Sequence, residues 1–151
     1  MTKHTLLLLM LFALLLAPGA QSFAAKASSG YTCCENVDQD MLREKWGIEL
    51  VTLHVGAGGY IVDFRYRVVD PSKAAPLGER TLKPYLEDVA TNTKLIVPAP
   101  AKVGALRNKP QEYKTGRVYF IEFANPGRII KPGAKVNVAV GDLLVENVIV
   151  Q

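Results

Sequence analysis

Hydrophobic and polar positions follow a helical period between residues 38 and 47 and an alternating period beyond them. Asp38 is a typical N-cap residue, and Gly47 stands where a helix commonly ends. This stretch therefore predicts one short helix. Its buried side would consist of Met41, Leu42 and Trp46.

Beyond residue 47, apolar residues alternate with polar ones in short stretches, which is typical of half-buried antiparallel strands. The clearest of these stretches covers residues 60–69. Its apolar face would consist of Tyr60, Val62, Phe64, Tyr66 and Val68, and its exposed face of Asp63, Arg65 and Arg67. With this one included, the predicted strands are 48–55, 60–69, 85–89, 94–97, 117–123, 136–140 and 143–150.

About seven short strands separated by Gly, Pro and Asn predict an all-β protein, and they favour a single antiparallel β-sandwich over a closed barrel. The length of 151 residues leaves room for one domain of ordinary size. We expect a signal peptide at 1–24, a polar leader at 25–37, and a sandwich domain at 38–151 that begins with the short helix.

Three stretches of the predicted sandwich resemble exported bacterial proteins with an Ig-like fold. They are "VDFRYRVVDPSKA" at 62–74, "YFIEFANPG" at 119–127 and "KPGAKVNVAVGD" at 131–142. The resemblance covers most of residues 46–151. It implies an Ig-like sandwich and export, and it implies no particular activity, because sandwiches of this type carry unrelated functions.

The N-terminus has the pattern of a secretory signal peptide. Lys3 and His4 precede an unbroken apolar run at residues 6–16, and small residues follow it. The run is shorter than the roughly 20 apolar residues of a spanning helix. We expect cleavage after Ala24, with residues 25–27 as the second choice and an uncleaved anchor as the alternative. The mature protein would then be periplasmic or extracellular and would have no transmembrane span.

Composition and charge narrow the classes of partner. Apolar residues make up 49% of the chain and charged residues 21%, which is typical of a packed globular protein. The formal net charge of +4 is small, and no basic helix or aromatic-interleaved basic motif is present, so nucleic acid is not an expected partner.

Residues 98–116 contain three prolines and no clear period, so they predict a long surface loop, or a loop with one small element inside. This region is basic. Lys102, Arg107, Lys109, Lys114 and Arg117 could form a surface for an anionic polymer, a lipid head group or an acidic protein. The alternative is a solvated loop without a partner.

No arrangement of residues predicts catalysis. His54 is the one histidine beyond the signal peptide, whereas blue-copper sites and the common catalytic zinc sites need more histidines. No serine lies in a G-x-S-x-G motif, and Glu122 occupies an ordinary alternating position of its strand. We therefore predict a protein that is not an enzyme and that needs no cofactor.

The adjacent thiols of Cys33 and Cys34 could have several chemical states and roles. They could form a vicinal disulfide or link two chains into a homodimer. They could also stay reduced. As soft ligands they could hold Cu(I), with Met41 as an extra ligand, or serve in thiol–disulfide exchange.

The leading prediction is thus an exported, non-enzymatic protein that binds or scaffolds another extracytoplasmic protein or polymer. The alternative is a periplasmic thiol-redox or Cu(I)-handling protein that uses Cys33 and Cys34.

Overall fold

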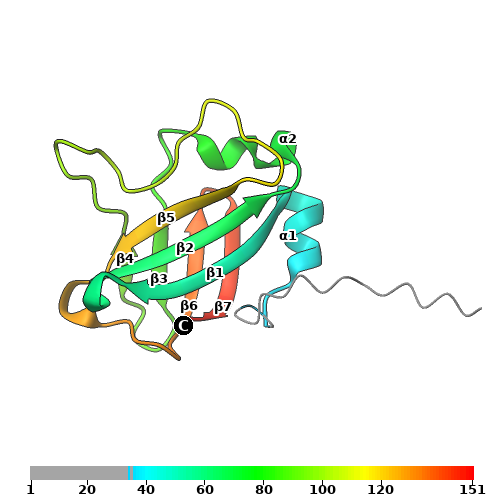
Figure 1. Ribbon diagram of the computed structural model, residues 1–151. Helices are drawn as coiled ribbons and strands as arrows, with labels where there is room; N and C mark the ends of the chain where they lie inside the picture. Colours follow the sequence, from blue (N-terminus) through cyan, green and yellow to red (C-terminus); the bar gives the residue numbers. More distant parts are fainter. Residues whose placement is uncertain (1–33, 35) are drawn as a thin grey trace, which may run out of the picture.

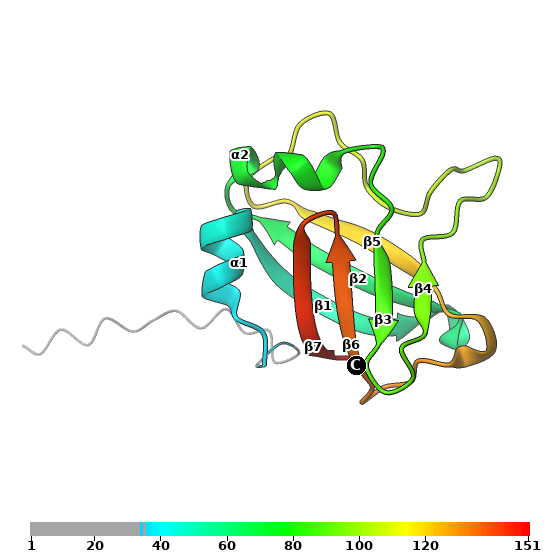
Figure 2. The same cartoon turned by 180° about the vertical axis from the view of Figure 1, so that it is seen from behind.

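The computed structural model describes residue 34 and residues 36–151. Over this part the chain forms seven strands in two antiparallel sheets, with a few short helices (Figures 1 and 2). The prediction of a mostly β protein is therefore confirmed. The predicted signal peptide and most of the polar leader lie outside the described residues. None of the helices described is long and apolar enough to cross a membrane.

The first sheet has the order β1-β2-β5 and the second the order β4-β3-β6-β7. Every pair of neighbouring strands is antiparallel. The strands are β1 (Ile48–Gly56), β2 (Ile61–Val68), β3 (Tyr85–Asp88), β4 (Lys94–Ile96), β5 (Val118–Ala124), β6 (Lys135–Val140) and β7 (Leu143–Ile149). Each lies within one or two residues of its predicted range, because each carries its own alternating pattern.

The two sheets face each other, and the strands of one cross those of the other obliquely (Figures 1 and 2). The core between them takes alternate residues from both sheets. Its largest fully buried side chains include Phe64, Tyr66, Leu86 and Phe123. The predicted core face of residues 60–69 is confirmed from Val62 to Val68.

Tyr60 differs from the prediction, because it precedes β2 and is 54% exposed. The chain turns there through a 3-10 turn, η2 (Ala57–Gly59), so Tyr60 no longer follows the alternation of the strand. Its ring instead contacts Arg128, whose guanidinium carbon lies 5.2 Å from the ring centroid.

Asp63 also differs, because the alternating pattern places it on an exposed face but it is only 5% exposed. Arg65 lies against it, with Nε 2.8 Å from Asp63 Oδ2. His54 lies opposite Asp63 on β1, with Nε2 3.9 Å from the same oxygen. A short carboxylate can be buried on the outer face of a sheet when longer polar side chains lie over it.

The predicted short helix is α1 (Gln39–Trp46). It begins after Asp38, whose carboxylate accepts a hydrogen bond from the Met41 amide at 2.9 Å. It ends at Gly47, which adopts a left-handed conformation with φ of 61°. The side-chain amide of Gln39 exchanges two hydrogen bonds with the Leu50 backbone, so the helix is tied to the outer edge of β1.

Residues 36–151 also contain the helical turns α2 (Pro71–Ala74), η3 (Ala75–Gly78) and η4 (Pro126–Arg128). The long segment before β5 was predicted to be either a plain loop or a loop with one small element inside. The structure has the second form. Within that element Arg107 forms an isolated bridge with Ile121. Leu106 and Asn108 exchange backbone hydrogen bonds with β5 at 2.9 and 3.0 Å. Residues 106–108 therefore cover the outer edge of β5 and form one wall of the site described next.

Candidate functional site

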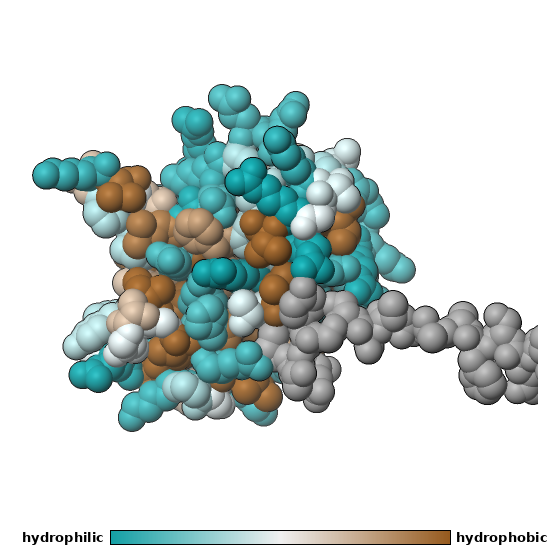
Figure 3. All heavy atoms as spheres, viewed as in Figure 1, coloured by the Kyte–Doolittle hydropathy of each residue, from teal (hydrophilic) through white to brown (hydrophobic). Residues whose placement is uncertain are grey.

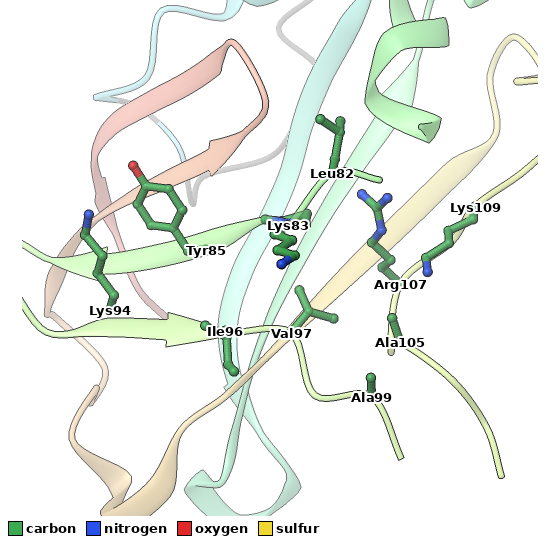
Figure 4. A pocket seen from close by; sticks show the side chains of 11 residues that line it. Leu82, Lys83, Tyr85, Lys94, Ile96, Val97, Ala99, Ala105, Arg107 and Lys109 are labelled. Atoms are coloured by element: carbon green, nitrogen blue, oxygen red, sulfur yellow. The ribbon is translucent and has the colours of Figure 1, made fainter. Parts of the chain in front are cut away.

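A pocket of about 450 Å³ opens where β4 and the covered edge of β5 diverge (Figure 4). Its size falls within the range of about 300–1,000 Å³ that is typical of small-molecule sites. Its walls come from residues 82–85, which lead into β3, from β4 and the residues after it, and from residues 105–109. β4 pairs with β3 and not with β5, so no strand pairing closes the space between β4 and residues 105–109.

Seven of the eleven residues that line the pocket are apolar or aromatic. They are Leu82, Pro84, Tyr85, Ile96, Val97, Ala99 and Ala105. On β4, Leu95 points into the core, so the alternation turns Ile96 outward, where it is 66% exposed. Apolar atoms reach the surface on the side of the molecule where β4 lies (Figure 3).

Every ionisable side chain in the walls other than Tyr85 is a cation. These side chains are Lys83, Lys94, Arg107 and Lys109, and none of the described residues that line the pocket is acidic. Lys94 lies over the ring of Tyr85, with Nζ 4.6 Å from the ring centroid. We call this site the cationic pocket. Cations around a low-dielectric concavity concentrate a positive potential there, which attracts anions.

Arg107 is buried, with 6% of its surface exposed. The prediction that it belongs to an exposed basic surface is therefore wrong. The cause of this burial is its bridge to Ile121. Residues directly opposite each other on an antiparallel pair point to the same side, and Ile121 faces the core. The side chain of Arg107 must therefore point inward as well.

The buried guanidinium of Arg107 is incompletely paired. Its Nη2 donates to the carbonyl oxygen of Glu79, and its Nη1 has no hydrogen-bond partner among the residues that the structure describes. No carboxylate among the described residues forms an ion pair with it. Burial lowers the pKa of Arg107, which is the expected response of a cation taken out of water.

The nearest hydroxyl groups do not supply the missing negative charge. Tyr66 and Tyr113 share a hydrogen bond of 2.9 Å between their hydroxyl oxygens. Burial raises the pKa of both phenols above the usual value, so both stay neutral near pH 7. Arg107 therefore remains a buried positive charge beside the cationic pocket without a counter-ion in the described part of the chain.

The structure divides the five basic residues that the sequence singled out. Arg107 and Lys109 line the cationic pocket, whereas Lys102, Lys114 and Arg117 are exposed outside it. Arg117 lies over the ring of Tyr119, with its guanidinium carbon 5.6 Å from the centroid. Lys83 and Lys94 were not predicted, because they are far from residue 107 along the chain and only sheet pairing brings them close.

The proposed soft-metal set lies only partly within the described residues. Cys34 is buried in the core with 3% exposure, and Met41 packs against the same core. Cys33 is not among the described residues. Over the described chain, no group of three His, Cys, Asp or Glu side chains is placed to hold a metal ion. A copper or redox role for Cys33 and Cys34 stays a prediction.

His54 lies near acids but not near Ser72. On the first sheet, Asp63 lies opposite His54 of β1 on one side and opposite Glu122 of β5 on the other. Ser72 follows the far end of β2, and five residues of strand separate Asp63 from that end, which is a span of about 16 Å. These positions do not form a serine nucleophile with its base.

The cationic pocket is thus the described site with the most distinctive chemistry. It has mostly apolar walls, three lysines in its lining, and a buried guanidinium for which residues 34 and 36–151 supply no counter-ion. Comparison of the chain with models of protein families, with curated proteins and with solved structures finds no match. The function is therefore argued from the geometry of this pocket.

Proposed function

We propose that this protein is an exported, non-enzymatic binding protein with an Ig-like β-sandwich fold, and that it binds its ligand in the cationic pocket. The observation that carries the proposal is a concavity of about 450 Å³ with apolar walls in which all four charged side chains are positive. A ligand for such a site must combine an apolar part with negative charge.

The strand order supports the Ig-like part of the proposal. A constant-type immunoglobulin domain has its first, second, fifth and fourth strands in one sheet and its third, sixth and seventh strands in the other. Here the first, second and fifth strands form one sheet, and the third, sixth and seventh belong to the other. The two arrangements differ only in the sheet that takes the fourth strand.

Export rests on the signal-peptide pattern, and we expect the mature protein to begin at Ala25. The export machinery recognises an apolar run of this length, and the signal peptide is then cleaved off at the small residues that follow the run. Intact-mass measurement of protein recovered from outside the cytoplasm checks this. A mass that still includes residues 1–24 would contradict the prediction of cleavage and favour an anchored form.

Binding in the cationic pocket can be tested with 8-anilinonaphthalene-1-sulfonate, a fluorescent probe that is apolar and carries one negative charge. We expect saturable binding of one probe per chain to the folded protein. The neutral analogue N-phenyl-1-naphthylamine should bind about tenfold more weakly, because it cannot use the positive potential, and a factor of ten corresponds to about 1.4 kcal/mol. Fluorescence titration measures both affinities.

Two tryptophan substitutions locate the bound probe. Ala99 lines the pocket and is exposed, so Ala99→Trp should fill the pocket and abolish binding without disturbing the core. Ala101 is exposed on the same segment but does not line the pocket, so Ala101→Trp is the matched control and should bind normally. Equal binding by the two variants, or binding that never saturates, would reject the pocket as the ligand site.

A further inference from the structure

We infer that the ligand of the cationic pocket is a single-chain amphiphile with one negative charge, of the fatty-acid type, whose carboxylate lies at the Arg107–Lys109 end. This inference rests on the proposed function and deepens it by naming the class of ligand. It depends on three features of the pocket: the charge of Arg107, the placement of the cations, and the absence of free polar groups in several of the walls.

The charge of Arg107 requires a negative partner. A buried cation without a counter-ion loses its hydration and gains no ion pair in return, which is an unfavourable arrangement. A carboxylate placed beside it interacts through a low-dielectric interior, where the Coulomb attraction is stronger than in water. The ligand can therefore supply the counter-charge that the described residues do not.

The placement of the cations indicates one negative charge and its position. Arg107 and Lys109 lie next to each other at one end of the pocket, whereas Lys94 lies at the opposite end (Figure 4). Lys94 is already placed over the ring of Tyr85. Lys83 is exposed and thus remains hydrated. Of the two cations at the Arg107–Lys109 end, only Arg107 is buried, and its guanidinium balances one negative charge. A dianion would bring a second negative charge, which is costly to desolvate.

The walls favour a hydrocarbon chain over a peptide. Pro84 has no amide hydrogen, and the Ala105 carbonyl accepts from the Arg107 amide at 2.8 Å. Tyr85 and Ile96 pair with each other in the sheet. A peptide would have to bury its own amide groups against these walls without partners, whereas an acyl chain has no such groups.

Calorimetric titration with octanoate, octanol and octyltrimethylammonium tests the inference, because the three share one chain and differ in head-group charge. We expect octanoate to bind at least about tenfold more tightly than octanol, as a charge-assisted contact at a desolvated site would give, and the cation not to bind. Octanol binding as tightly as octanoate would overturn the inference.

Charge variants test where the carboxylate lies. Lys109→Glu should weaken octanoate binding about tenfold and leave octanol unchanged. Lys102→Glu makes the same charge change on the same segment outside the pocket, so its octanoate affinity should match that of the original protein. Arg107→Met should remove the preference for octanoate over octanol. It should keep the fold, because methionine removes an uncompensated buried charge, which is itself destabilising, and fills similar space with an apolar side chain.

The outcomes separate the class of ligand from the site. If Ala99→Trp blocks the sulfonate probe but octanoate shows no advantage over octanol, the ligand class is wrong and the binding site stands. If the probe itself does not bind in the pocket, the proposed function fails. A trileucine peptide with a free carboxylate that binds more tightly than octanoate would identify a peptide C-terminus as the ligand and overturn the acyl-chain assignment.

Discussion

Phe64→Ala should lower the free energy of unfolding by about 3–5 kcal/mol, the range typical of removing a buried aromatic side chain. Phe64 is fully buried on β2, the central strand of its sheet. Its ring lies 5.9 Å from that of Tyr66, so the substitution also removes an aromatic contact. Urea or thermal unfolding measures the loss.

Leu144→Ala on β7 is the matched control, because Leu144 is 46% exposed and its loss should cost less than about 1 kcal/mol. Equal losses for the two variants would mean that the core does not lie between the sheets. Arg65 is a poor control although it is exposed, since Arg65→Ala would remove the hydrogen-bond partner of buried Asp63.

Asn125→Ala should lower the free energy of unfolding by about 3 kcal/mol, because it leaves several buried backbone groups without partners. Asn125 is fully buried at the end of β5. Its Nδ2 donates to the carbonyls of Gly59 and Ile130 at 2.9 and 2.8 Å, and its Oδ1 accepts from the Ile130 amide at 3.0 Å. The side chain therefore joins the β1–β2 turn to the segment after β5.

Asn137→Ala tests whether the cost comes from this network rather than from the loss of an amide side chain. Asn137 accepts one hydrogen bond, from the Asn147 amide at 2.9 Å, in an exposed setting. Its replacement should cost about 1 kcal/mol or less. Denaturant unfolding of both variants should show a clear difference, and similar midpoints would contradict the structural role of Asn125.

Local pattern was enough to predict the helix and all seven strands. Asp38 and Gly47 mark the ends of α1 because capping and the left-handed conformation depend on the residue itself and its nearest neighbours. The strand ranges followed from alternation, which reports one buried face whatever that face packs against. The same information was insufficient for Asn125, which the sequence presents only as a turn residue before Pro126 and Gly127.

The pocket could be predicted only in part. The sequence pointed to Arg107 and Lys109 as members of a basic stretch, and it placed both on an exposed surface. Nothing local shows that Arg107 is buried, because its inward direction comes from a bridge to Ile121. Lys83 and Lys94 join the site through the pairing of β3 with β4, and no spacing along the chain indicates this.

The sequence by itself therefore determined the helix α1, the seven strands and the core face of β2 from Val62 to Val68, since these depend on near neighbours and on the period of apolar positions. Only the tertiary structure decided which sheet takes β4, where the pocket opens, and that Arg107 is buried with no counter-ion in the described part of the chain. Those features depend on pairing between segments far apart in the chain, whose geometry a linear pattern does not contain.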